Sequence, residues 1–103
     1  MDLAENKALI ERFLGLFGKR DLDGISAILA DDLTWWSTGG DLFPMAGTKN
    51  KTELMGAFQG IMTLFRDGIE QGPVGIVAEG DKVAVASECH AITQDGRHYD
   101  NFI

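Results

Sequence analysis

The spacing of hydrophobic residues changes once along the chain. Before residue 69, most apolar residues recur every three or four positions, as they do along one face of a helix. From residue 69 onward, apolar and polar residues follow the two-residue period of strands. Helices first and strands last indicate the α+β class, with the helices packed on one face of a curved antiparallel sheet.

The first two helices have recognisable ends. The helical spacing over residues 3–17 predicts the first helix, and Gly18 is suited to its C-cap because glycine accepts the left-handed conformation. Asp21 can cap the start of the second helix. Asp31 and Asp32 are expected beyond its end, because the C-terminus of a helix disfavours anions.

The third helix begins with a capping signal. Asn50 and Glu53 have the three-residue spacing of a capping box, which predicts a helix over residues 51–65. Its stripe of Met and aromatic residues is typical of a face buried in the core. We expect Gly68 to end this helix.

A short strand and a long loop separate the second and third helices. The strand is expected over residues 33–37 and contains Trp35 and Trp36. Adjacent strand residues point to opposite faces, so one indole should face the core or a cavity, and the other a second layer, a partner or solvent. Residues 37–47 are rich in turn formers and are long enough for a cavity rim.

The C-terminal part predicts three strands, over residues 69–78, 82–93 and 97–103, the first bent at Gly72 and Pro73. Asp95 and Gly96 have the composition of a two-residue hairpin loop. That loop would pair Gln94 with Arg97, Ile92 with Tyr99, His90 with Asn101 and Glu88 with Ile103. Cross-strand partners share a face. This register would therefore collect four polar side chains on one face: Glu88, His90, Tyr99 and Asn101.

This polar face has two interpretations. It is either a solvent-exposed or dimer-facing sheet surface, or the polar end of a ligand cavity. In the cavity, His90 would transfer protons near neutral pH while Glu88 held its tautomer. A loop of three residues would shift the register by one and change both interpretations. Glu88 and His90 lack an evident third ligand, so we expect no metal site.

Size and charge exclude several classes of function. The 103 residues indicate a single domain, 1–103. A net charge of −7 disfavours nucleic acid and anionic membranes as partners. The N-terminus lacks the features of a signal peptide, and no apolar run reaches membrane-spanning length, which predicts a cytoplasmic protein. The single cysteine, Cys89, excludes an internal disulfide and fits a buried strand position.

Several fragments together resemble a known family. They are DLDGISAILADDLTWW, the loop reaching PMAG, and VAEGDKVAVASECHAITQDGRHYDNF. They are similar to the SnoaL-like, ketosteroid-isomerase-related branch of the nuclear transport factor 2-like superfamily, over essentially the whole chain. The resemblance implies a cone-shaped, strongly bent antiparallel sheet around three helices, a mostly apolar pocket, and a homodimer that is often packed through the sheet.

The resemblance also bears on the reaction. The tyrosine of steroid isomerases falls at Phe13, and their general-base aspartate falls near Ser37. Neither replacement can take over the role, which argues against steroid isomerisation. Relatives continue beyond the strand that ends at Ile103, so we expect a C-terminally truncated domain. Its exposed strand edge would favour dimerisation.

Two functions remain as alternatives. The first is a small-molecule-pocket protein that, if catalytic, performs cofactor-free acid/base isomerisation, cyclisation or hydrolysis of a small apolar or polyketide-like compound. His90 would transfer protons, oriented by Glu88. The residues expected to contact the substrate are Tyr99, Asn101, Trp35, Ser37, Phe13 and Phe17. The second alternative is a non-catalytic ligand-binding or dimerisation module.

Overall fold

Three helices precede the main sheet, as the spacing of hydrophobic residues predicts. The computed structural model describes residues 2–38 and 46–103. In chain order the elements are α1 (Leu3–Gly18), α2 (Leu22–Ile28), β1 (Trp35–Ser37), β2 (Gly47–Lys49), α3 (Lys51–Met62), β3 (Glu70–Glu79), β4 (Lys82–Ile92) and β5 (His98–Phe102). The α+β class is therefore confirmed.

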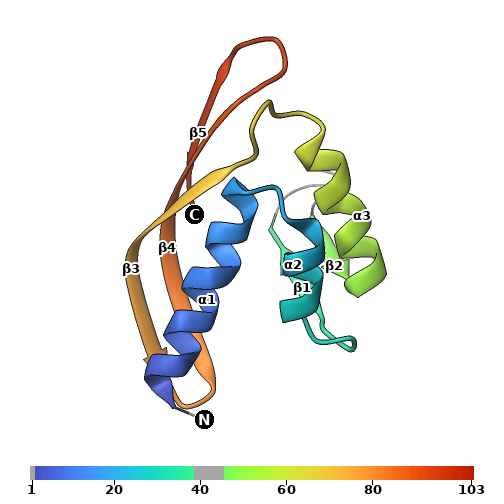
Figure 1. Ribbon diagram of the computed structural model, residues 1–103. Helices are drawn as coiled ribbons and strands as arrows, with labels where there is room; N and C mark the ends of the chain where they lie inside the picture. The colour runs from blue at the N-terminus through green and yellow to red at the C-terminus, as the bar shows by residue number, and fades with distance from the viewer. Residues whose placement is uncertain (1, 39–45) are drawn as a thin grey trace.

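The strands form two antiparallel sheets (Figure 1). The main sheet has the order β3-β4-β5, and a smaller sheet pairs β1 with β2. The register between β3 and β4 shifts between Pro73 and Gly75, a bulge that bends the strand next to the predicted Gly72–Pro73 break. Helix α1 packs against β3 and β4 on one side and against α2 on another, so the long strands curve around it.

Side-chain caps fix the starts of the helices. The carboxylate of Asp21 accepts a hydrogen bond from the Gly24 backbone N–H at 2.9 Å. Asn50 and Glu53 form the predicted capping box, each side chain accepting from the other residue's backbone N–H. Both predicted caps are confirmed. Each satisfies backbone donors that the first turn of a helix leaves unpaired.

The ends of the helices differ from the expectation. Helix α1 includes Gly18, its C-cap is Lys19, and Arg20 takes the left-handed conformation at φ 56°. The prediction of a glycine cap was therefore wrong. The guanidinium of Arg20 donates to the backbone carbonyl oxygens of Met62 and Arg66, at 3.4 and 3.2 Å, and so ties the end of α1 to the end of α3.

Helix α3 ends at Met62, three residues earlier than predicted, and Gly68 does not end it. The segment after α3 instead holds the β4–β5 hairpin, because Phe65 forms an isolated bridge with Thr93. The side-chain amide of Gln94 donates to the Phe65 carbonyl at 2.9 Å. Phe65 is buried, which explains why it shares the hydrophobic stripe of the helix without being helical.

The loop between the first strand and α3 contains a strand that the sequence did not reveal. Strand β2 pairs Gly47 with Ser37 and Lys49 with Trp35. Three residues of mixed character carry no strand pattern of their own, and here pairing with β1 defines the strand. Residues 39–45, which belong to the expected cavity rim, lie outside the described residues.

The core lies between the helices and the inner face of the main sheet. Ile25 and Leu54 are completely buried in it. Four aromatic rings continue the core in a closed cycle of edge or tilted contacts, with centroids 5.1 to 6.2 Å apart: Phe13, Phe17, Phe58 and Trp35. The side chain of Trp36 points the other way and is 69% exposed. The expected division of the two indoles is confirmed.

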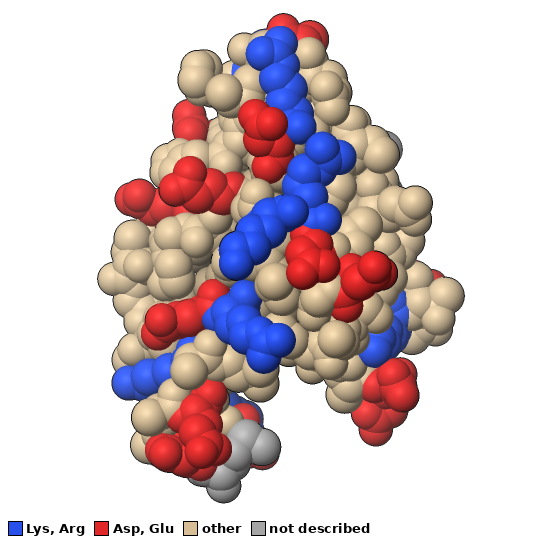
Figure 2. All heavy atoms as spheres, in the orientation of Figure 1, with Lys and Arg blue, Asp and Glu red and all other residues tan. Residues whose placement is uncertain are grey.

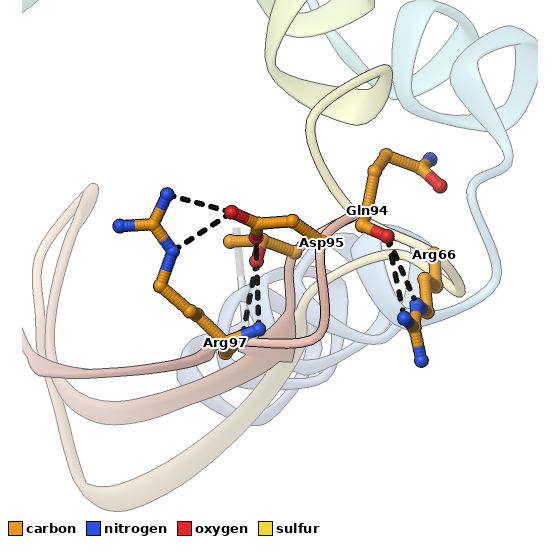
Figure 3. Close-up of polar contacts among 5 residues, drawn as sticks. Arg66, Gln94, Asp95 and Arg97 are labelled. Carbon is orange, nitrogen blue, oxygen red and sulfur yellow. Dashed lines mark hydrogen bonds and ion pairs between the residues drawn. The ribbon is translucent and has the colours of Figure 1, made fainter.

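The hairpin loop has three residues, 94–96, rather than two. Thr93 and Arg97 face each other across it, since the Thr93 N–H donates to the Arg97 carbonyl at 2.9 Å. Gly96 takes a positive φ of 88°, as the last residue of such a loop requires. The guanidinium of Arg97 binds the Asp95 carboxylate at 2.6 and 2.8 Å (Figure 3). These contacts stabilise the longer loop.

Figure 3 also shows how the loop is attached to the rest of the fold. Arg66 donates to the backbone carbonyl of Gln94 at 3.3 and 3.4 Å. The Gln94 N–H in turn donates to the Leu64 carbonyl at 3.0 Å. The loop is therefore held by contacts from Arg66 and Leu64 as well as by contacts among its own residues.

The surface carries both acidic and basic side chains. On the face in Figure 2, Lys and Arg side chains form a broken band from the top toward the lower left, with Asp and Glu side chains on both sides of it. Among the described residues, no helix combines the length and the apolar character needed to cross a membrane.

Candidate functional site

The three-residue loop changes which side chains share a face. Strand β4 pairs Glu88 with Phe102, His90 with Asp100 and Ala91 with Tyr99. The register expected from a two-residue loop was therefore wrong by one position, which moves every β5 side chain to the opposite face. Glu88 and His90 lie on the exposed outer face, whereas Tyr99 and Asn101 share the other face with Cys89 and Ala91. The expected cluster of four polar groups is divided.

His90 lies in a row of acidic residues on the outer face. Its Nδ1 is 2.6 Å from the Asp100 carboxylate and its Nε2 is 3.8 Å from that of Glu88. Glu70 is its register partner on β3. The hydrogen bond to Asp100 is the main cause that raises the pKa of His90 above its usual value, and Glu88 adds to it. The pKa is therefore shifted by exposed carboxylates and not by a cavity.

Replacing Asp100 by asparagine is expected to lower the pKa of His90, because the largest cause of its elevation is removed. Asp100 stabilises the protonated imidazole in the folded state. Its contribution is complete below the ordinary histidine pKa of 6.5 and is lost as the pH rises through the folded pKa. The measurement is an NMR titration of the His90 ring proton. Glu88→Gln is the matched variant and should produce a smaller decrease; equal titration midpoints in all three proteins would contradict this account.

Tyr99 and Asn101 interact with each other. The Asn101 side-chain N–H donates to the Tyr99 hydroxyl at 3.1 Å, and the Tyr99 ring packs on Phe65 with centroids 5.4 Å apart. Both side chains are exposed; Tyr99 lies near the loop and Asn101 near the other end of β5. Neither is among the described residues that line the pocket of the inner face.

A pocket of about 450 Å³ lies between the helices and the inner face of the main sheet. Its helical wall is apolar and comes from α1 and α3, as Ile10, Phe13, Leu14, Phe17, Phe58 and Met62. The opposite wall comes from the sheet and includes Ile69, Gln71, Val85, Ser87 and Ile103. Ile61 and Trp35 complete the described lining. Pockets of this size and apolar character are typical of small-molecule sites.

Of the residues expected to contact a substrate, Phe13, Phe17 and Trp35 line this pocket. Ser37 lies beside it, where its hydroxyl oxygen accepts a hydrogen bond from the Trp35 indole N–H at 3.0 Å. This contact fixes the tilt of the indole against the ring of Phe58. Among the described residues at this end of the pocket, the neutral hydroxyl of Ser37 cannot serve as a general base at neutral pH.

The polar groups of the pocket are two residues that the sequence analysis did not single out. Ser87 is 2% exposed, and its hydroxyl has no hydrogen-bond partner among the described residues. The side-chain oxygen of Gln71 accepts from the thiol of Cys89 at 3.6 Å. Burial raises the pKa of that thiol, so it keeps its proton. Alternation along β4 puts Ser87 on the same face as Cys89, but nothing in the sequence showed that this face borders a pocket.

A second depression, of about 550 Å³, lies on the outer side of the sheet. It is lined by acidic residues and both histidines of the chain, with Asp67, Glu70, His90, His98 and Asp100. Within residues 2–38 and 46–103, no group of three or more His, Cys, Asp or Glu side chains is arranged to hold a metal ion. This depression therefore offers exposed charge rather than a defined site.

Solved structures share this fold. AclR from Streptomyces galilaeus, a proposed hydroxylase, superposes with a TM-score of 0.81 at 21% identity, over 98% of this chain and 76% of its own. An NTF2-like protein of unknown function from Burkholderia pseudomallei has a TM-score of 0.76 at 23% identity, over 99% and 77%. TerC, co-crystallized with polyporic acid, has a TM-score of 0.76 at 21% identity, over 94% and 75%.

Comparison by sequence shows to which protein family the chain belongs. No curated protein matches the chain with significance. The family of SnoaL-like domains matches residues 10–102, which include the second half of α1 and every later element. The resemblance predicted from the sequence is thereby confirmed. The chain belongs to the SnoaL-like domain family and has the α+β fold of the NTF2-like superfamily.

Proposed function

We propose that this protein binds an uncharged, mostly apolar small molecule in the inner pocket. The observation that carries the proposal is the pocket itself, which is lined by aromatic and aliphatic side chains and has only two polar groups on the sheet, Gln71 and Ser87. A ligand with an apolar body would remove this surface from water, which is the main source of affinity in such pockets. The co-crystallization of TerC with polyporic acid supports a small organic compound as the ligand.

Binding is better supported than acid/base catalysis. The described lining contains no Asp, Glu, His, Lys or Arg, so no strongly acidic or basic side chain meets a bound molecule there. Glu88 and His90, the predicted proton-transfer pair, lie on the opposite face of β4. Their catalytic role stays a prediction, and it would require a ligand on the outer face. The homodimer and the cytoplasmic location predicted from the sequence also remain predictions.

The fluorescence of Trp35 can report binding. Replacing the exposed Trp36 by phenylalanine leaves Trp35, in the pocket wall, as the only tryptophan. Titration of this variant with 1-tetralone, a small bicyclic ketone, is expected to quench the emission and to reach saturation.

Two further valine variants, each in the W36F background, locate the binding. Val85→Phe fills the pocket and should weaken the affinity by at least about tenfold, which corresponds to about 1.4 kcal/mol. Val77→Phe is the matched control, because Val77 is 67% exposed on β3, and it should leave the affinity unchanged. Quenching that never saturates, or that Val85→Phe does not weaken, would contradict the proposal.

A further inference from the structure

The two polar residues of the pocket lie on the same face of neighbouring strands. Gln71 on β3 is the register partner of Cys89 on β4. Ser87 is two residues from Cys89, so its side chain points to the same, inner face. Gln71 and Ser87 are therefore diagonal neighbours and both border the pocket.

The hydroxyl of Ser87 has no hydrogen-bond partner in the part of the chain that the structure describes. It is the one buried side-chain nitrogen or oxygen without a hydrogen bond among the described residues. Leaving a buried hydroxyl unpaired is unfavourable, and native proteins rarely do so without a reason. Since Ser87 borders the pocket, a bound molecule can supply the missing partner.

The amide of Gln71 is oriented by Cys89. The thiol keeps its proton because it is buried, and it donates a hydrogen bond to the amide oxygen of Gln71 at 3.6 Å. The oxygen of Gln71 is thereby turned toward Cys89. The amide nitrogen, which carries two N–H donors, is left for the pocket that Gln71 lines.

We propose that Ser87 and Gln71 together recognise a carbonyl oxygen on the ligand. This inference rests on the proposed function and narrows it to cyclic ketones and related carbonyl compounds with an apolar body. An acceptor oxygen satisfies both groups, since the hydroxyl and the amide N–H can each donate to it. A ligand group that can only donate a hydrogen bond could pair with the hydroxyl oxygen of Ser87 but not with the amide N–H of Gln71. A carboxylate or an ammonium is disfavoured, because the described lining is uncharged and offers no counter-ion.

A pair of matched probes tests this recognition. 1-Tetralone and tetralin have the same bicyclic skeleton, and only the ketone has an oxygen. Their affinities are measured by NMR titration of the wild type, Ser87→Ala and Gln71→Met. Because the two compounds differ in hydration, the readout is the change in their affinity ratio between proteins. Ser26→Ala is the matched control, since Ser26 on α2 does not line the pocket.

The ketone should lose about 3- to 10-fold in affinity in Ser87→Ala, as expected for one neutral hydrogen bond. Tetralin should bind Ser87→Ala as well as the wild type or better, because the unpaired hydroxyl is gone. Gln71→Met should show the same selective loss, so the test does not depend on one variant. The thermal stability of ligand-free Ser87→Ala should not fall. If the Ser87 hydroxyl made a structural hydrogen bond, its removal would lower that stability.

The outcomes separate the two proposals. Binding of both probes with an affinity ratio that neither Ser87→Ala nor Gln71→Met changes overturns carbonyl recognition and leaves the binding pocket in place. Failure of the wild type to bind either probe overturns the proposed function, and carbonyl recognition with it.

Discussion

Replacing Leu54 by alanine is expected to lower the free energy of unfolding by about 2–5 kcal/mol. Leu54 lies in α3, is 0% exposed and belongs to the core cluster between the helices. The truncation removes buried apolar surface and leaves a cavity, because the surrounding side chains close only part of the space. The measurement is urea unfolding, compared at an unchanged denaturant slope.

Leu64→Ala is the matched control for this change. The same atoms are removed just after the end of α3, where Leu64 is 58% exposed. Its effect should stay within about 0.5 kcal/mol, as for most surface substitutions. Similar losses at both positions would show that Leu54 does not belong to the core between the helices and the sheet.

The second large effect is expected for Gly68→Ala. Gly68 has a φ of 93°, and an added Cβ would lie 2.7 Å from the backbone oxygen of Phe17. That oxygen cannot move freely, because it accepts hydrogen bonds from the Arg20 and Ile69 N–H groups. The positive φ alone costs about 1–3 kcal/mol for a residue with a side chain, and the close contact adds to it. We expect a loss of stability of at least this size in thermal or urea unfolding.

Gly56→Ala should have the opposite sign. Gly56 lies inside α3, and an added Cβ would meet no atom within 4 Å. Alanine is the better helix former by about 0.5–1 kcal/mol, so this variant should be more stable than the wild type. A Gly68→Ala variant as stable as the wild type would refute the close approach of Gly68 to the end of α1, and a destabilised Gly56→Ala variant would contradict the open space beside Gly56.

Local signals in the sequence were sufficient to predict the fold class and the order of the helices and the main sheet. The caps at Asp21 and Asn50 depend on a side chain and a backbone group three residues away, and both formed as predicted. The change of period near residue 69 placed the helices before the main sheet. Strand β2 was missed because its three residues have no strand pattern of their own and become a strand only by pairing with Trp35 and its neighbours in β1.

The predicted polar cluster of the candidate site depended on the length of the β4–β5 loop, and the sequence was insufficient to predict that length. Asp95 and Gly96 fit a two-residue loop, but the Thr93 hydroxyl accepts from the Arg97 N–H at 3.0 Å and favours the loop of three. The resulting one-residue shift separates His90 from Asn101 and places it opposite Asp100. Arg66 and Leu64, which are distant in sequence, also contact Gln94 in the turn, and such contacts cannot be predicted from the loop residues alone.

The pocket is a property of the assembled fold. Phe13, Phe17 and Trp35 could be expected in its wall from their spacing and from the family resemblance. Ser87 and Gln71 could not, because their importance arises from burial beside a cavity formed by distant elements. Apolar walls with a few placed polar groups are what a small-molecule site requires.

The most direct test of the binding pocket is methyl NMR of the protein with isoleucine and valine labelled, titrated with 1-tetralone. The account predicts shifts confined to the labelled residues of the pocket, which are Ile10, Ile61, Ile69, Val85 and Ile103. The exposed Val74, Val77 and Ile92 report on the rest of the sheet and should not shift. Shifts at Val77 or Ile92 with none at Val85 and Ile61 would contradict a ligand site between the helices and the inner face of the sheet.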